Sequence, residues 1–155
     1  MTEQEIRTIL NRQREYFATG ATLSRKFRAE QLGKLKASLQ RHEEELNAAL
    51  QQDLGKSRME SYMCEIGLTL SELTWMQKHL RGLMQEKRVP TPLSQFAAIS
   101  FRSPSPYGTV LIMSPWNYPV LLTLDPLIDA IAAGNTAVVK PSAYAPATAA
   151  VLKNI

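Results

Sequence analysis

All nine prolines of this 155-residue chain lie between Pro90 and Pro146. Proline lacks a backbone N–H and clashes with the preceding turn, so helix interiors tolerate it poorly. Charged residues show the opposite distribution, because residues 1–88 carry 15 of the 18 basic and 12 of the 14 acidic side chains. We therefore expect a helical region over residues 1–88, followed by short buried elements joined by turns.

The composition excludes several classes of protein. With 45% apolar and 21% charged residues, the chain suits one folded domain better than disorder. No apolar run approaches the roughly 18 residues that a membrane span needs. Charges of both signs are mixed without interleaved aromatic residues, so no nucleic-acid partner is expected despite a pI of about 9.3. The single cysteine and the lack of a leader pattern predict a cytoplasmic location.

Capping signals and apolar spacing predict four helices in the first region. Thr2 and Glu5 have the spacing of a capping box and predict a first helix that ends at Gly20. Apolar residues that recur every three or four positions predict three further helices, over residues 23–39, 46–54 and 63–84. Taken alone, this region is also compatible with a helical interaction module.

The reactive side chains of the helical region are predicted to be structural. Cys64 lies beside the apolar stripe of the last helix, with no histidine at a helical neighbour position, which favours a structural thiol. His42 and His79 have no cysteine or carboxylate at ligand spacing, so surface histidines are expected and no metal site is predicted.

The residues after Val89 alternate short apolar segments with turns. Residues 95–101 have a weak strand pattern, so residues 89–107 are predicted to form a linker that contains a strand. The apolar run over residues 108–113 predicts a strand that is covered on both faces. Three further elements are predicted: a helix over residues 120–133, a strand over 136–140 and a helix from Pro146. The predicted fold class is therefore α/β.

The order β-α-β-α predicts where ligands bind. A crossover of about 20 residues is long enough to join parallel strands, and ligands collect at the carboxyl ends of such strands. Those ends are followed by Ser114-Pro115-Trp116-Asn117 and by Lys140-Pro141-Ser142. The first strand is followed by no glycine-rich phosphate turn, so a standard dinucleotide fingerprint is absent. We expect the two polar segments to face one crevice.

Three motifs in this order resemble a known family. They are Ser114-Pro115-Trp116-Asn117-Tyr118-Pro119, Ala130-Ile131-Ala132-Ala133-Gly134-Asn135 and Val138-Val139-Lys140-Pro141-Ser142. Asp53-Leu54-Gly55-Lys56 and Glu65-Ile66 also fall where that family has them. The chain resembles the amino-terminal third of an NAD(P)-dependent aldehyde dehydrogenase of the class 3, fatty-aldehyde type. The resemblance implies an oligomerisation hairpin within residues 89–107 and an incomplete first half of a Rossmann-like cofactor domain over residues 108–155.

The resemblance also implies roles for the residues of the crevice. Asn117 matches the asparagine of the oxyanion hole, although its position also suits an N-cap. Lys140 matches the lysine that binds the adenosine ribose, although a lysine at the end of a strand is commonly just exposed. Cofactor-lining positions are matched by Ser114, Pro115, Trp116 and Ser142. For Trp116, a place in the core is the alternative.

One departure from the family pattern leaves the choice between NAD and NADP open. The family usually has a glutamate three residues after the lysine, and this chain has Ala143 there. The change removes an acceptor for the ribose hydroxyls, and it also removes a negative charge that would repel a 2′-phosphate.

The activity that the resemblance implies is the oxidation of a small-molecule aldehyde to a carboxylate. It proceeds through a cysteine thiohemiacetal, hydride transfer to NAD(P)+ and hydrolysis of the thioester. The family's nucleophilic cysteine and general base are expected beyond position 155, so these residues alone are expected to be inactive. A truncated, non-catalytic binding or assembly module is the alternative, and an acylating relative is a third option.

A homo-oligomer is also expected, as a dimer in the complete protein. A half-sheet of two strands should expose apolar side chains that a complete domain would cover. These side chains are Val110, Ile112, Val138 and Val139.

Overall fold

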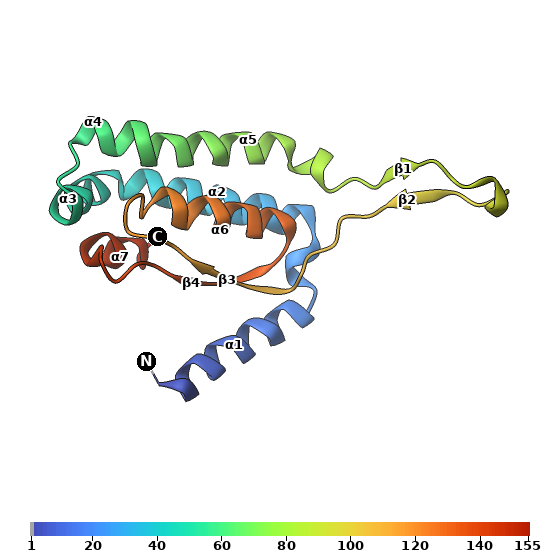
Figure 1. Cartoon of the computed structure of the whole chain (residues 1–155), viewed down its shortest axis with the longest axis horizontal. Helices are drawn as coiled ribbons and strands as arrows, with labels where there is room; N and C mark the ends of the chain where they lie inside the picture. Colours follow the sequence, from blue (N-terminus) through green and yellow to red (C-terminus); the bar gives the residue numbers. More distant parts are fainter. Residues whose placement is uncertain (1) are drawn as a thin grey trace.

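A two-stranded parallel sheet lies between two helices in the computed structural model, which describes residues 2–155 (Figure 1). Strand β3 (Thr109–Met113) pairs in parallel with β4 (Thr136–Lys140), and α6 (Leu121–Ala133) forms the crossover between them. Helix α1 (Glu3–Ala18) packs on one side of this sheet and α6 on the other. The parallel β-α-β arrangement confirms the predicted α/β class.

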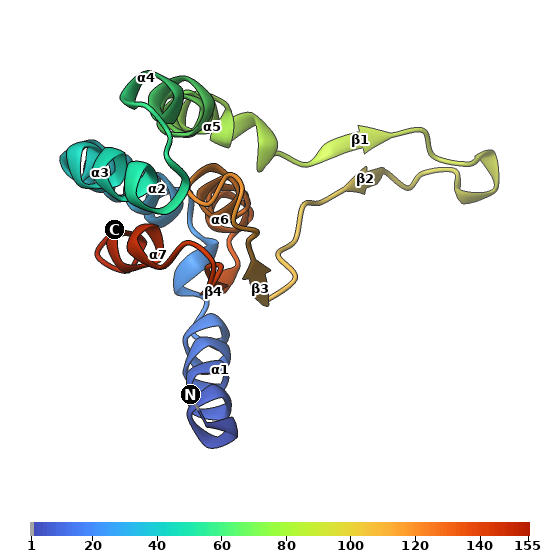
Figure 2. The ribbon, with the colours of Figure 1, turned by 60° about the vertical axis from the view of Figure 1, so that its left-hand side comes forward.

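The helical segments that follow α1 form a layer over α6 (Figures 1 and 2), and three of them match the predicted helices over residues 23–39, 46–54 and 63–84. The segments are η1 (Ala21–Leu23), α2 (Arg25–Arg41), α3 (Glu43–Leu54), α4 (Arg58–Ser61), the π-helical segment η2 (Tyr62–Ile66) and α5 (Gly67–Leu83). Helix α2 packs on α5 and α6, and α3 packs on α7 (Pro146–Leu152). One apolar core therefore joins both parts of the chain, through Leu32, Leu39, Leu50, Leu73, Val120 and Ile128. No helix of residues 2–155 is long and apolar enough to cross a membrane.

The predicted capping box at the start of α1 is confirmed. The Thr2 N–H donates to Glu5 Oε2 (2.6 Å), and the Glu5 N–H donates to Thr2 Oγ1 (3.3 Å). Two orphan amides of the first turn are thereby satisfied. The helix ends at Ala18, and Gly20 follows it in the left-handed conformation with φ 73°.

Residues 87–102 form an arm that extends away from the rest of the molecule (Figures 1 and 2). Strand β1 (Lys87–Val89) pairs antiparallel with β2 (Ser100–Arg102), and η3 (Leu93–Gln95) lies at the tip. The predicted strand over residues 95–101 is therefore wrong except at its end. The tip has to reverse the chain, and Ala97 takes a positive φ of 78° that no strand allows.

The apolar side chains of the sheet are exposed in a different pattern from the predicted one. Ile112 is buried, so the expectation of an exposed Ile112 is wrong. Leu111 and Met113 are 63% and 64% exposed instead. Successive residues of a strand point to opposite faces, so these two side chains lie on the face opposite Ile112.

A buried arginine from α2 closes the carboxyl end of α6. Arg28 donates from Nε to the Thr22 carbonyl oxygen (2.9 Å) and from a terminal nitrogen to that of Ala132 (3.0 Å). The Thr22 hydroxyl donates to the Gly134 carbonyl oxygen (2.7 Å). These donors satisfy carbonyls that a helix end leaves unpaired, and the positive charge suits the negative end of the helix dipole. Desolvation by burial lowers the pKa of Arg28 below its ordinary value.

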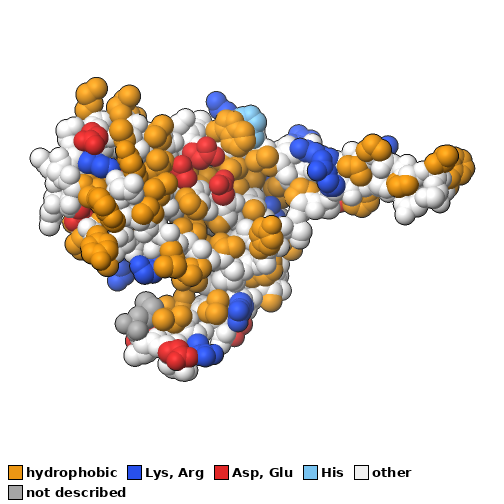
Figure 3. Space-filling model, in the orientation of Figure 1, with side chains coloured by type: hydrophobic (Ala, Val, Ile, Leu, Met, Phe, Trp, Pro, Cys, Tyr) orange, Lys and Arg blue, Asp and Glu red, His pale blue; other side chains and the backbone are white. Residues whose placement is uncertain are grey.

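Three carboxylates lie close together where α5 and α6 pack. Burial, and to a smaller extent the nearby charges of Glu72 and Asp129, together raise the pKa of Asp125 to about 6. Burial also raises the pKa of Asp129. Figure 3 shows acidic side chains gathered on this face of the molecule. Asp125 therefore binds a proton more tightly in the folded state than in the unfolded state.

Replacement of Gly134 by alanine should destabilise the protein strongly. Gly134 has a φ of 89°, and a Cβ there would clash with the Arg28 guanidinium. The left-handed conformation alone costs a residue with a Cβ about 1–2 kcal/mol. Urea unfolding should show at least that loss for Gly134→Ala. The matched control is Gly82→Ala, since nothing lies within 4 Å of its Cβ, and it should gain about 0.5–1 kcal/mol. Equal stabilities of the two variants would contradict this account.

Replacement of Asp125 by asparagine should stabilise the protein at neutral pH. The folded pKa of about 6 exceeds the unfolded value of 3.8. The contribution of Asp125 to the free energy of unfolding is therefore fully present below about pH 4 and is lost as the pH rises through 6. Asp125→Asn should raise the melting temperature at pH 7 and lose that advantage below pH 4. The control is Glu15→Gln at an exposed position of α1, which should change the melting temperature at pH 7 only slightly. A gain for Asp125→Asn that persists at pH 3 would refute the assignment.

Candidate functional site

The carboxyl ends of β3 and β4 lie side by side, as predicted for a parallel pair. The Ser114 N–H donates to the Lys140 carbonyl oxygen (3.3 Å), which joins the two loops that follow the strands. Met113 and Lys140 are opposite each other in the register. The segments 114–119 and 140–145 therefore begin at one edge of the sheet, where parallel sheets bind ligands.

The loop after β3 is held at its start and end by Thr123 of α6. The buried Thr123 hydroxyl donates to the Pro119 carbonyl oxygen (2.5 Å), and Thr123 Oγ1 lies 2.6 Å from Ser114 Oγ. Ser114 and Pro119 are both buried, whereas Trp116 and Asn117 between them are exposed. The anchored ends hold the middle of the loop toward solvent.

A buried ion pair from the helical region holds the same loop at a third place. Lys56 Nζ donates to Glu65 Oε1 (2.6 Å) and to the Asn117 carbonyl oxygen (2.8 Å). It also lies 4.1 Å from the centre of the Tyr118 ring, a cation–π distance. Glu65 Oε2 accepts the N–H of Val120 (2.7 Å). The Lys56 and Glu65 side chains are only 9% and 0% exposed, so both charges are paired inside the protein.

The π-helical segment η2 places Glu65 in this position. In its wider turn the backbone of Gly67 comes close to Tyr62, and the Gly67 N–H donates to the Tyr62 carbonyl oxygen. A Cβ on Gly67 would lie 2.8 Å from that oxygen. Gly67 is therefore the residue type that this turn accommodates. π-Turns inside helices occur frequently at functional sites. Apolar periodicity predicts a continuous helix here and carries no signal for the π-turn.

The alternative role of Asn117 as an N-cap is wrong. Helix α6 begins after Val120, and no side chain of its own N-cap residue binds the first turn. Glu65 Oε2 instead accepts the N–H groups of Val120 (2.7 Å) and Leu121 (3.3 Å). Within residues 2–155, the Asn117 side-chain amide has no hydrogen-bond partner. It is therefore available to a ligand.

Trp116 does not belong to the core. Its side chain is 53% exposed, which excludes the alternative of a buried core tryptophan. It stands beside the exposed Asn117 on the loop after β3. Pro115 is exposed as well, so the exposed part of this loop presents both apolar and polar groups.

The loop after β4 presents one cation. Lys140 is exposed, and its Nζ contacts only the neighbouring Pro141 carbonyl oxygen (3.2 Å) among the residues described. Ser142 is buried, and its hydroxyl accepts the Tyr144 N–H (3.2 Å). Ala143 between them is exposed. The Lys140 ammonium is therefore free to bind an oxygen ligand, and Ser142 shapes the loop.

An aspartate of the helical region completes this loop at the start of α7. The carboxylate of Asp53 accepts the N–H groups of Ala147 (3.2 Å) and Thr148 (2.7 Å) and the Thr148 hydroxyl (2.8 Å). These are unpaired amides of the first turn, to which a carboxylate is well suited. Helix α7 is therefore attached to α3 at the same end at which it follows the loop.

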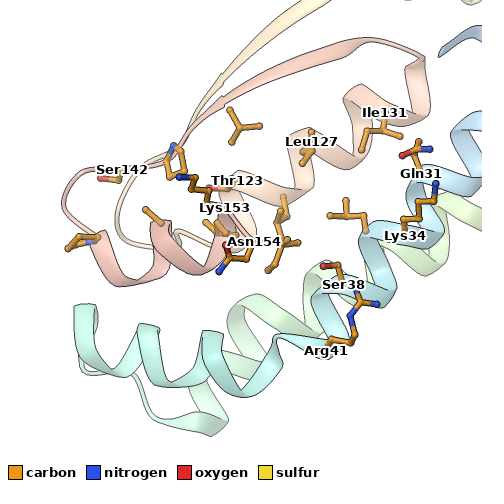
Figure 4. Close-up of a pocket in the computed structure, with 18 of the residues that line it drawn as sticks. Gln31, Lys34, Ser38, Arg41, Thr123, Leu127, Ile131, Ser142, Lys153 and Asn154 are labelled. Carbon is orange, nitrogen blue, oxygen red and sulfur yellow. The ribbon is translucent and has the colours of Figure 1, made fainter. Parts of the chain in front are cut away.

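An open cavity of about 1190 Å³ lies between α2, α6, α7 and the end of β4 (Figure 4). Its apolar wall includes Leu124, Leu127, Ile131 and Val139. Lys34 and Arg41 of α2 lie across from the α6 side chains, as Figure 4 shows. Of the residues predicted to bind the cofactor, only Ser142 lines this cavity.

The remaining reactive side chains contribute nothing to the site. Cys64 is half-buried within η2, as expected for a structural thiol. His79 is exposed and stacks on Trp75 at 4.2 Å, and His42 Nδ1 lies 2.8 Å from the Ser38 carbonyl oxygen. Residues 2–155 hold no group of three or more His, Cys, Asp or Glu side chains that could bind a metal ion.

A helical layer on a parallel sheet, with polar loops at the carboxyl edge, defines an α/β protein with a Rossmann-like half. The chain belongs to the aldehyde dehydrogenase family, whose sequence model matches residues 1–155. The predicted resemblance is confirmed. The Rossmann-like half is thus the beginning of the family's NAD(P)-binding fold.

Its relatives include class 3 enzymes. The 4,4′-diaponeurosporen-aldehyde dehydrogenase of Staphylococcus aureus is 45% identical over 140 residues, which are 90% of this chain and 30% of that protein. Aldehyde dehydrogenase family 3 member B1 of Homo sapiens is 45% identical over 133 residues, 86% of this chain and 28% of that protein. The chain therefore spans about a third of the length of these curated relatives.

Solved structures have the same fold. The substrate-bound AldH of Staphylococcus aureus superposes with a TM-score of 0.94 at 43% identity, over 96% of this chain and 32% of that one. The glyceraldehyde-3-phosphate dehydrogenase GapN of Methanocaldococcus jannaschii, complexed with NADP, superposes with a TM-score of 0.83 at 22% identity, over 99% and 33%. The second match bears on the fold alone.

Proposed function

We propose that the protein oxidises an aldehyde to a carboxylate with NAD(P)+, and that these residues supply its oxyanion donor and the first half of its cofactor fold. The observation that carries this proposal is the exposed, unpaired amide of Asn117 on a loop held at three places. An immobilised donor aimed at developing charge is the main source of electrostatic stabilisation in acyl-transfer chemistry.

The proposed chemistry follows from the charge that forms. Attack of a thiolate on an aldehyde carbon places negative charge on the former carbonyl oxygen. The neutral Asn117 amide donates a hydrogen bond to that oxygen without protonating it. The nucleophile and the general base are proposed to lie in the family's remaining two thirds. The proposed nucleophile is a cysteine other than Cys64, which is half-buried in η2, so residues 1–155 alone should be inactive.

The residues after the strands fit a dinucleotide. Lys140 offers a free ammonium group at the carboxyl edge, and the exposed Pro115 and Trp116 form the adjoining loop surface. The buried Ser114 and Ser142 are proposed to line the cofactor site through the backbone of these loops. Bound NAD(P)+ would accept the two electrons that the aldehyde carbon loses. Membership of the aldehyde dehydrogenase family supports NAD(P) use in general.

We also propose that the complete enzyme is a cytoplasmic homodimer, and the arm supports the dimer. The large apolar side chains of the arm are exposed, which is unfavourable in a lone monomer. They are Leu93, Phe96, Ile99 and Phe101. The same exposure would suit the alternative of a non-catalytic assembly module, but a dimer contact within an enzyme accounts for it equally well.

Asn117→Ala should separate catalysis from stability in the complete enzyme. Loss of one oxyanion donor costs on the order of 100- to 1000-fold in kcat, the value known for a protease. Since the side chain makes no hydrogen bond within residues 2–155, the melting temperature should barely change. Steady-state kinetics and thermal unfolding on one preparation test this. Lys140→Ala is the contrast, because it should weaken NAD(P)+ binding while kcat at saturation stays near wild type. A fully active Asn117→Ala enzyme would refute the proposal.

Ala143→Glu should increase the preference for NAD+ over NADP+. A carboxylate beside Lys140 would accept hydrogen bonds from the ribose hydroxyls of NAD+ and would repel the 2′-phosphate of NADP+. The measurement is the ratio of kcat/KM for the two cofactors, with Ala143→Gln as the uncharged control. An unchanged ratio would show that position 143 does not reach the ribose.

A further inference from the structure

We propose that the buried Lys56–Glu65 pair is a positioning device for the Asn117 amide. The inference rests on the proposed function, because it assigns to the pair a role in the same oxyanion site. Lys56 and Glu65 are positioning residues: neither side chain is exposed to a substrate, and both act through the loop that carries Asn117.

Lys56 holds the backbone of Asn117 itself. Its ammonium has three N–H donors, and two of its partners are Glu65 Oε1 (2.6 Å) and the Asn117 carbonyl oxygen (2.8 Å). The Tyr118 ring lies against the same ammonium, 4.1 Å from its centre. The peptide plane that follows Asn117 is therefore fixed from one side by a charged donor.

Glu65 holds the other end of the same turn. Its Oε2 accepts the N–H groups of Val120 and Leu121, at the start of α6. Its Oε1 accepts from Lys56, so one carboxylate connects the first amides of α6 with the carbonyl group of Asn117. The backbone is thus held at both ends of this turn: Lys56, which is bound to Glu65 Oε1, holds the Asn117 carbonyl group, and Glu65 Oε2 holds the Val120 N–H.

The energetics favour positioning over simple stabilisation. A buried ion pair rarely stabilises a fold more than apolar residues of similar volume do, because two charges must be desolvated. Its contribution is a fixed geometry with directional bonds. A displacement of about 1 Å at a reacting group can cost roughly 100-fold in rate. A pair that fixes the Asn117 backbone therefore acts on kcat.

The test is a set of kinetic cycles in the complete enzyme. Lys56→Met and the double variant Lys56→Met/Glu65→Gln are each made in the wild type and in Asn117→Ala. The double variant leaves no unpaired buried charge, and the side-chain carbonyl of the introduced glutamine still accepts the Val120 N–H, so it should fold even where Lys56→Met does not. For every variant, kcat, the KM for NAD+ and the melting temperature are measured.

The matched control is Lys36→Met. Lys36 of α2 is a partly buried lysine whose Nζ donates to Thr74 Oγ1 of α5 (2.8 Å), with no bond to the loop after β3. The Lys36→Met enzyme should lose some stability and keep its kcat. A loss of kcat in this control equal to that of Lys56→Met would overturn the positioning role.

The expected result is non-additive kinetics. The double variant should lose about 10- to 100-fold in kcat in the wild type, less than about twofold in Asn117→Ala, and change the KM for NAD+ by less than about threefold. Its melting temperature should exceed that of Lys56→Met. Equal losses of kcat in both backgrounds, or recovery of wild-type kcat in the double variant, would overturn the positioning role alone. A wild-type enzyme without aldehyde oxidation would overturn the proposed function and this role with it.

Discussion

The paired charges of Lys56 and Glu65 connect three segments that are far apart in sequence: the turn after α3, the π-turn before α5 and the loop after β3. Each charge alone would be very costly at this depth, so the two side chains and their backbone partners have to keep their mutual geometry. The loop that carries Trp116 and Asn117 is held in place by its hydrogen bonds to these two side chains. The position of the candidate site therefore depends on residues of the helical region.

Two further side chains of that region act in the same way. Arg28 binds a carbonyl group at the end of α6, and Asp53 binds the first amides of α7, as Glu65 does at the start of α6. Neither α6 nor α7 has a side-chain cap from its own N-cap residue. The helical region thus supplies the partners that the helix ends of the sheet half lack, and one apolar core joins the two parts.

Local signals predicted the elements better than they predicted the roles of residues. The capping box of Thr2 and Glu5 and the parallel strands around the crossover followed from short-range patterns, and both are confirmed. The strand expected over residues 95–101 failed, because alternation alone does not show where an arm reverses. The N-cap alternative for Asn117 failed because a distant carboxylate already occupies the start of α6. No local pattern carries that information.

The sequence by itself determined the α/β class, the helical first region, the parallel β-α-β unit and the family, because periodicity, proline placement and ordered motifs are local properties of the chain. The tertiary structure decided which side chains complete the site. Lys56 and Glu65 are 61 and 55 residues away from their backbone partners Asn117 and Val120. Only folding brings such groups within hydrogen-bonding distance, and only burial makes their charges require each other.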